Sequence, residues 1–304
     1  MLHKLLKNMN ILYFGSSGLL STKPLKALLD NGFKVCAVVF DETENAAQQL
    51  GNIAIVNTQT DSIVSLAWAH QIPTLRLGNA FNDSLLALQN YQPDIILVSC
   101  YARILPSSVT SLAKLGCFNI HPSLLPAYRG PEPIFWQLKF GEQEMGVSIH
   151  KLTETIDGGD ILKQQPLTLR NGLTRLEIER FFANAAADLL LEVLGKLEHY
   201  LNLAVNQNNT LLKKSAAYRS FAQADDFNLS NHWAAQRLYN FVCAYAHSNR
   251  YFNCSINGEI FRITEALWFD ITSYMDEPYN IEKDKVTFNC SSGLIQCCLS
   301  KYHL

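Results

Sequence analysis

Asn119, His121 and Asp157 are the residues of this sequence whose types and spacing suit acid–base chemistry. Asn119 and His121 lie two positions apart in an apolar run that ends at Pro122, so on a strand their side chains share one face. Asp157 precedes two glycines, whose backbone lets a carboxylate approach a cleft closely. A histidine and an amide can stabilise an oxyanion while a carboxylate orients the histidine or accepts a proton through water. These residue types therefore suit acyl transfer.

The same three residues also fit structural roles. A single histidine at a strand end commonly makes a local hydrogen bond, and an aspartate before two glycines is an ordinary turn signal. Asn119 would equally satisfy loop backbone groups. Nothing in the composition requires the three to meet, so the residues alone leave both interpretations open.

The elements that must position these residues alternate between apolar strands and helical segments. Strand patterns begin at Asn10 and cover residues 34–40, 53–56, 94–100 and 116–121, and helical patterns cover residues 24–31, 62–70 and 83–90. The strands lack polar alternation, which is typical of parallel strands covered by helices on both faces. The chain is therefore predicted to form an α/β domain with a doubly wound, mostly parallel sheet, and ligands should bind beyond the carboxyl ends of its strands.

The second half of the chain predicts a strand pair, a long helix and a smaller domain. Residues 146–152 and 161–169 form the strand pair, joined through the turn at Asp157, and residues 173–201 form the helix. The following stretch is rich in Asn, and a helix over 232–245 then precedes several short alternating strands. We expect a catalytic domain over residues 9–201, a linker over 202–220, and a small β-rich, OB-like domain over 221–304.

The wording of the motif adds a resemblance. Asn119-Ile-His121-Pro-Ser-Leu-Leu-Pro126, then Tyr128-Arg-Gly130 and later Asp157-Gly-Gly-Asp-Ile161, resembles the 10-formyltetrahydrofolate-dependent formyltransferases, in their methionyl-tRNA and sugar-amine branch. The resemblance is strong over residues 10–170 and weak after 220. It implies that Asn119, His121 and Asp157 form a catalytic triad, that 10-formyltetrahydrofolate is the co-substrate, and that no metal is needed.

The resemblance also implies which residues bind the two substrates. Residues 98–106 look like the family segment whose backbone holds the pterin ring, and the turn at 155–157 looks like its opposing wall. The implied folate-binding residues are Val98, Cys100, Tyr101, Ala102, Arg103, Ile104, Leu105, Thr155 and Ile156. The implied acceptor-binding residues are Gly15, Ser16, Tyr128, Arg129 and Gly130.

Charge favours a small acceptor over a tRNA. The net charge is -2, and residues 211–304 hold nine Lys or Arg against nine Asp or Glu. Residues 41–45 carry three acids where methionyl-tRNA formyltransferases usually carry a basic loop, and Cys243 replaces an expected arginine. Binding to a nucleic acid needs a basic surface, and these residues have no excess of Lys or Arg. We expect formyl transfer to a primary amine such as an amino sugar nucleotide, with Arg129 matching a phosphate; methionyl-tRNA is the alternative acceptor.

Two further alternatives remain open. A hydrolase that releases formate from the same donor is a close relative in chemistry, and a non-catalytic folate- or nucleotide-binding protein belongs to another class. The presence of all three triad residues favours the enzyme. The eight cysteines include no C-x-x-C pair, and no apolar run resembles a signal peptide or a membrane span. We expect a cytoplasmic protein without metal or membrane contact; the oligomeric state stays open.

Overall fold

The computed structural model describes residues 7–41, 48–50, 53–55, 62–77, 81–209, 217–246 and 251–300. The chain forms two compact units, each built from several segments. The first unit contains Met1–Pro131, Gly146–Leu167 and Arg180–Tyr218, and the second contains Glu132–Met145, Thr168–Glu179 and Arg219–Leu304. The domain boundaries expected from the sequence, 9–201 and 221–304, remain a prediction.

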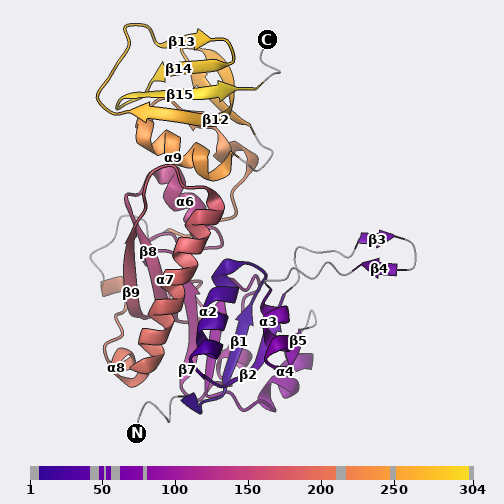
Figure 1. The fold of residues 1–304 in the computed structure, drawn as a ribbon. Coiled ribbons are helices and arrows are strands. Elements are labelled where there is room, and N and C mark those ends of the chain that lie inside the picture. Colours follow the sequence, from indigo (N-terminus) through magenta and orange to yellow (C-terminus); the bar gives the residue numbers. More distant parts are fainter. Residues whose placement is uncertain are drawn as a thin grey trace. The chain divides into compact units, whose positions relative to one another are not determined.

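The first unit is built on a seven-stranded sheet with the order β5-β2-β1-β6-β7-β8-β9 (Figure 1). Its strands are β1 (Ile11–Gly15), β2 (Val35–Phe40), β5 (Thr74–Arg76), β6 (Ile95–Ser99), β7 (Gly116–His121), β8 (Glu144–Lys151) and β9 (Ile161–Thr168). The strands from β5 to β7 pair in parallel, and β8 runs antiparallel to β7. The predicted mostly parallel α/β sheet is confirmed.

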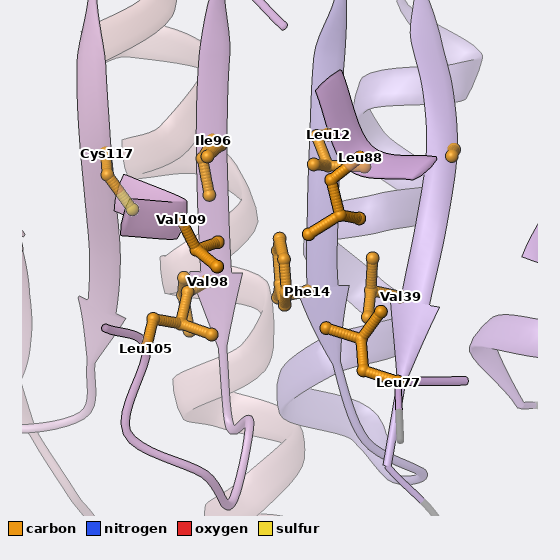
Figure 2. Packing of buried hydrophobic residues seen from close by; sticks show 11 residues of the cluster. Leu12, Phe14, Val39, Leu77, Leu88, Ile96, Val98, Leu105, Val109 and Cys117 are labelled. Carbon is orange, nitrogen blue, oxygen red and sulfur yellow. The ribbon is translucent and has the colours of Figure 1, made fainter. Parts of the chain in front are cut away.

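Helices cover both faces of this sheet. They are α2 (Leu19–Asp30), α3 (Ile63–Ala69), α4 (Phe81–Gln89), α5 (Ser107–Thr110), α7 (Arg175–Gly195) and α8 (Leu197–Asn202). On one face, Leu12 and Phe14 of β1 pack in a buried cluster with Leu88 of α4 and Val109 of α5 (Figure 2). The alternate residue Tyr13 points to the other face, where its hydroxyl donates to the Ser21 carbonyl of α2 at 2.7 Å. Side chains alternate between the two faces along a strand, and helices cover both faces of β1. Every residue of β1 is therefore buried, which explains why its sequence is continuously apolar.

Helix α2 begins earlier than its sequence pattern predicts. The predicted start was Pro24, but the helix begins at Leu19 and contains that proline. Proline has no N–H to give to the carbonyl four residues before it, which is that of Leu20. Ser99, at the end of β6, donates its hydroxyl to this Leu20 carbonyl at 2.6 Å, and Ser21 donates to the Ser99 carbonyl at 2.5 Å. A contact from the sheet therefore lets the helix run through the proline.

Two other sequence predictions are corrected. The segment predicted as the third strand, residues 53–56, instead forms the short β4 (Ile53–Ile55), which among the described residues pairs with β3 (Gln48–Leu50) in a separate two-stranded sheet. The edge position beside β2 is taken by β5, because the crossover through α3 returns the chain there. The helix predicted over 173–201 breaks at Lys196, which leaves the helical conformation directly after Gly195.

The second unit carries a six-stranded sheet with the order β10-β11-β12-β15-β14-β13. Its elements are α6 (Pro133–Phe140), β10 (Leu229–Ser230), α9 (Ala235–Tyr245), β11 (Phe252–Ile256), β12 (Glu259–Asp270), β13 (Tyr279–Glu282), β14 (Lys285–Asn289) and β15 (Leu294–Leu299). Phe135 of α6 contacts Phe227, Phe241 and Tyr245 at ring-centroid distances of 5.0 to 5.6 Å. The predicted β-rich character is confirmed, whereas the OB-like closure stays a prediction.

No helix within the described ranges is long and apolar enough to cross a membrane.

Candidate active site

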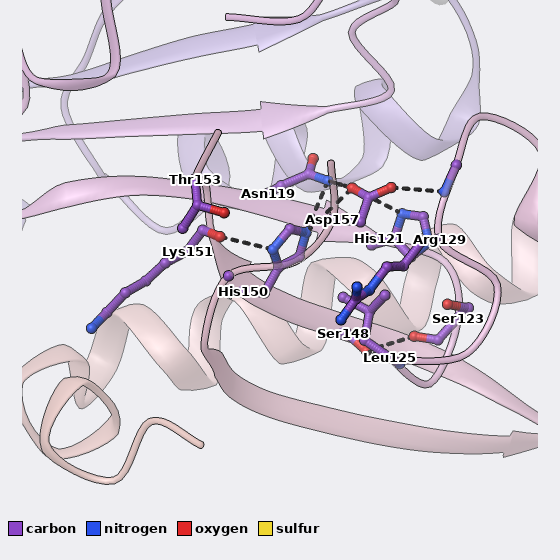
Figure 3. Close-up of polar contacts among 12 residues, drawn as sticks. Asn119, His121, Ser123, Leu125, Arg129, Ser148, His150, Lys151, Thr153 and Asp157 are labelled. Carbon is purple, nitrogen blue, oxygen red and sulfur yellow. Dashed lines mark hydrogen bonds and ion pairs between the residues drawn. The ribbon is translucent and has the colours of Figure 1, made fainter. Parts of the chain in front are cut away.

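Asn119, His121 and Asp157 lie together at the carboxyl end of β7 (Figure 3). The Asn119 Nδ2 donates to Asp157 Oδ1 at 3.3 Å, and His121 Nδ1 lies 3.7 Å from the same oxygen. The site is largely shielded from solvent, since the His121 side chain is 5% exposed, that of Asp157 is 12% exposed, and Asn119 is half-buried. The structure therefore brings together the three residues that the sequence singled out.

The turn between β8 and β9 brings the Asp157 carboxylate to this point. Asp157 has φ 50°, in the left-handed region that costs energy for a residue with a side chain. Its Oδ2 accepts the Gly130 N–H at 2.9 Å. Two residues further on, a Cβ at Gly159 would stand 2.0 Å from the Lys151 carbonyl oxygen, so only glycine fits there. Close backbone contact thus requires the glycine at position 159.

His150 completes the group, and the sequence analysis missed it. It is directly opposite Asn119 in the β7–β8 pairing, so the two side chains share one face of the sheet. Its Nδ1 lies 2.9 Å from the Lys151 carbonyl and therefore donates a proton there, which leaves Nε2 as an acceptor for Asn119 Nδ2 at 3.2 Å. His150 Nε2 also lies 3.6 Å from Asp157 Oδ1. Only the strand register, which the sequence did not give, would have identified it.

The electrostatics of the site set the protonation states. Burial by itself raises the pKa of Asp157, but His121, His150 and the Gly130 N–H outweigh it, so the pKa is held well below its ordinary value. Burial lowers the pKa of His121, and the Asp157 carboxylate opposes this effect only in part. At neutral pH the site therefore holds an ionised aspartate beside a neutral histidine. His121 Nε2 lies 2.9 Å from the Tyr128 carbonyl and donates to it, so Nδ1 is the nitrogen left to take up a proton beside the carboxylate.

The residues expected to bind folate lie at the end of β6, in the segment after it, and in the turn between β8 and β9. Val98 and Leu105 are buried in the cluster of Figure 2, so only their backbone groups face a ligand. Cys100 is exposed and has φ 54°. The Tyr101 hydroxyl is buried, and the Arg103 side chain interacts with it.

The remaining members of this set are more accessible. Ala102, Ile104, Thr155 and Ile156 are exposed, and Arg103 is half-buried with its Nη1 donating to the Leu77 carbonyl at 3.2 Å.

The residues expected to bind the acceptor occupy two places. Gly15 ends β1 and is buried, and a Cβ there would lie 3.1 Å from the Ser21 side chain. The Ser16 N–H donates to Ser21 Oγ at 3.1 Å. Close packing of β1 on α2 thus accounts for the glycine at position 15.

The second place is the loop after β7. Tyr128 is buried, with φ 60°, and its carbonyl faces His121. Arg129 is bound through Nε and Nη2 to Gln207 Oε1, at 3.1 and 2.6 Å. Gln207 is 4% exposed and lies in the stretch predicted as a linker, so it too escaped the sequence analysis. Of the acidic stretch at 41–45, residues 42–45 lie outside the described residues.

Within the ranges that the structure describes, no three His, Cys, Asp or Glu side chains are grouped so as to hold a metal ion.

Comparison with known proteins places this site in a family. Residues 9–194 match the family model described as "Formyl transferase". The methionyl-tRNA formyltransferase of Synechococcus sp. (strain JA-3-3Ab) is 38% identical over 183 residues, which cover 60% of this chain and 56% of that protein. The methionyl-tRNA formyltransferase of Thermotoga maritima is 29% identical over 84% of this chain and 77% of that protein.

A solved structure extends the likeness in fold to nearly the whole chain. The N-formyltransferase of Helicobacter canadensis, crystallised with folinic acid and dTDP-3-aminofucose, superposes with a TM-score of 0.67 at 19% identity, over 96% of this chain and 99% of that one. The match to the Synechococcus relative, by contrast, spans little more than half of that protein's length, 56%. Since the family model covers more than half of the 304 residues and includes the whole β7 to β9 site, this chain belongs to the formyl transferase family.

Proposed function

We propose that this protein transfers a formyl group from 10-formyltetrahydrofolate to a primary amine, with Asn119, His121 and Asp157 as its catalytic residues. The observation that carries the proposal is the Asp157 carboxylate, which lies 3.3 Å from the Asn119 amide and 3.7 Å from His121 in a formyl transferase family chain. An ionised carboxylate, a neutral imidazole and an amide donor in a shielded site are the groups that acyl transfer to an amine requires.

The chemistry follows from the protonation states. The neutral amine attacks the formyl carbon, a C–N bond forms, and the carbonyl electron pair moves to the oxygen. The Asn119 N–H stabilises this oxyanion, and His121 adds a second donor when its Nδ1 takes up a proton. Asp157 accepts the amine proton through a water molecule, and the proton passes to the folate nitrogen as its bond to the formyl carbon breaks and the carbonyl reforms. The Asn119 bonds to Asp157 and His150, at 3.3 and 3.2 Å, are long enough to be exchanged for a bond to the oxyanion.

The donor site is proposed beside β6. It comprises the residues implied by the resemblance: Val98, Cys100, Tyr101, Ala102, Arg103, Ile104, Leu105, Thr155 and Ile156. The buried Tyr101 hydroxyl beside Arg103 supports this assignment, because a ligand with polar ring atoms would find hydrogen-bonding groups there. The folinic acid named with the Helicobacter canadensis structure is a folate and agrees with the same class of donor.

For the acceptor we propose a small amine such as an amino sugar nucleotide, contacting Gly15, Ser16, Tyr128, Arg129 and Gly130. Residues 211–304 have no net charge, which disfavours a polyanionic tRNA. Arg129 donates two of its five guanidinium N–H groups to Gln207. Its other N–H groups would bind a phosphate, so the guanidinium would contact Gln207 and the phosphate together. Methionyl-tRNA is the second candidate, and the names of the Synechococcus and Thermotoga relatives favour it.

A formyl-transfer assay tests both the proposed reaction and the proposed acceptor. The protein is given 10-formyltetrahydrofolate with a panel of amino sugar nucleotides, with charged initiator tRNA, and with no amine. We expect turnover with a sugar amine, and His121→Ala should lower kcat at least about 100-fold while donor binding is retained. His232→Ala, at an exposed histidine, is the control.

Three other results would contradict the proposed acceptor or the proposed reaction. Faster formylation of methionyl-tRNA would replace the proposed acceptor, and formate release without amine would indicate a hydrolase. Donor binding with no product in any reaction would leave a folate-binding protein.

A further inference from the structure

Gln207 is a buried side chain that joins the two loops carrying the candidate site. It opens the short 3-10 helix Gln207–Asn209. Its Nε2 donates to the main-chain oxygens of Asp157 and Gly159, at 2.8 and 2.7 Å. Its Oε1 accepts two bonds from Arg129, at 3.1 and 2.6 Å. A single amide therefore binds the loop after β7 through Arg129 and the turn after β8 through two carbonyls.

The turn needs such an anchor because Asp157 has a positive φ, 50°, which a residue with a Cβ adopts only when its surroundings hold it there. The same residue directs Oδ2 to the Gly130 N–H and Oδ1 to Asn119 and His121. Rotation of the Asp157 backbone would move the carboxylate away from all three partners together. The main-chain bonds from Gln207 therefore act on the position of the carboxylate.

We propose that Gln207 is a positioning residue of the reaction, one that acts through Asp157 and touches no substrate; this inference rests on the proposed function. A glutamine fits because its amide offers two donors to the two carbonyls and an acceptor to Arg129. A carboxylate of the same length has no donor and would face two carbonyl oxygens. An aliphatic side chain offers neither group and would leave two buried carbonyls unpaired.

The test compares Gln207→Leu and Gln207→Glu with the wild type. One readout is kcat and KM in formyl transfer, and the other is the titration of the Asp157 carboxyl by carbon-13 NMR, which does not depend on turnover. We expect both variants to lower kcat by roughly 10- to 100-fold with little change in KM, because a misplaced catalytic group affects the transition state. The pKa of Asp157 should rise toward its ordinary value as the carboxylate leaves its partners.

Gln137→Leu is the matched control. Gln137 is also buried, at 1% exposed, but its Nε2 donates to the Pro133 carbonyl of its own helix in the second unit. It should lose stability without altering the Asp157 titration.

The outcomes separate the two claims. Folded Gln207 variants with an unaltered Asp157 titration, or with wild-type kcat, would overturn the positioning role, even if their thermal stability had fallen. A wild-type protein that transfers no formyl group would overturn the proposed function, while the NMR comparison would still decide whether Gln207 positions Asp157.

Discussion

Asp157 illustrates how single residues in this protein acquire their properties from neighbours distant in the sequence. One oxygen of its carboxylate faces Asn119, His121 and His150, and the other accepts the Gly130 N–H. These partners stabilise the ionised form more than burial destabilises it, which keeps the pKa well below its ordinary value. The carboxylate is therefore ionised at neutral pH.

The lowered pKa of His121 predicts that stability depends on pH. In the folded state this residue binds fewer protons than in the unfolded chain, whose histidines titrate near about pH 6.5. Its neutral form is therefore fully accommodated above about pH 6.5, and stability falls as the pH drops from there toward the lower folded pKa. Asp157 also has a lowered pKa, but its charged form is the deprotonated one, so it stabilises the folded state fully above about pH 3.9. This stabilisation is lost only as the pH falls further, toward the lowered pKa.

The loss of stability caused by protonation of His121 is measured by urea unfolding between about pH 8 and about pH 5. The free energy of unfolding of the wild type should fall across this range more steeply than that of His121→Gln. His232→Gln, at an exposed position, should keep the wild-type slope. Equal slopes in all three proteins would contradict a neutral, buried His121.

At the scale of elements, β6 and α2 are joined by the hydroxyl groups of Ser21 and Ser99. Ser99 supplies to the Leu20 carbonyl the hydrogen bond that Pro24 cannot make. Ser99 is 1% exposed and its bond to Leu20 is partly buried, so removing the hydroxyl leaves a partly buried carbonyl without this partner. The junction lies where β1 ends at Gly15, beside the proposed acceptor residues.

We expect Ser99→Ala to lower the free energy of unfolding by about 1 to 3 kcal/mol, the cost of an unsatisfied buried polar group. Adding Pro24→Ala should recover part of this loss, because the new N–H at position 24 can bind the Leu20 carbonyl. Ser111→Ala, which removes an exposed bond to the Ser107 carbonyl, should change stability by less than about 0.5 kcal/mol. If the effects of Ser99→Ala and Pro24→Ala on the free energy of unfolding were simply additive, the two positions would not act on the same Leu20 carbonyl.

How far the sequence predicts these elements depends on whether local or distant contacts decide them. The strands β1, β2 and β6 were predicted because both of their faces are buried and their runs are almost continuously apolar. The start of α2 was missed because the partner of its free carbonyl is a serine 79 positions away.

The same distinction applies to the site. Asn119 and His121 follow from their spacing on one strand, whereas His150 depends on the register between β7 and β8, and Gln207 depends on how a later segment folds back. Neither signal is present in a local pattern of residue types.

For the whole molecule, the aromatic core of the second unit combines segments that the sequence assigned to different domains. Phe135 is 2% exposed and packs on Phe227, Phe241 and Tyr245, although it lies within the expected catalytic domain of residues 9–201. Lys139 of the same helix forms an ion pair with Asp226 at 2.6 Å. Helix α6 thus belongs to the core around α9, and the C-terminal segment is part of that core.

A chain cut after Tyr218 should therefore expose the apolar face of α6. We expect this shortened protein to bind a hydrophobic dye and to associate in solution, because the truncation removes three of the aromatic partners of Phe135. In the full chain, Phe135→Ala should cost about 3 to 5 kcal/mol by creating a cavity. Dye fluorescence and sedimentation measure the first effect, and urea unfolding measures the second. A monomeric, dye-free fragment would show that α6 does not need this core.

The position of Gln207 has a practical consequence for anyone who transplants this active site. The family model ends at residue 194, and a fragment cut there keeps Asn119, His121 and Asp157 but loses the side chain that fastens the Asp157 turn. A minimal enzyme or a chimera that ends at residue 194 would contain the three proposed catalytic side chains. It would lack the hydrogen bonds from Gln207 to the Asp157 turn. We therefore expect a working fragment to extend through the 3-10 helix Gln207–Asn209.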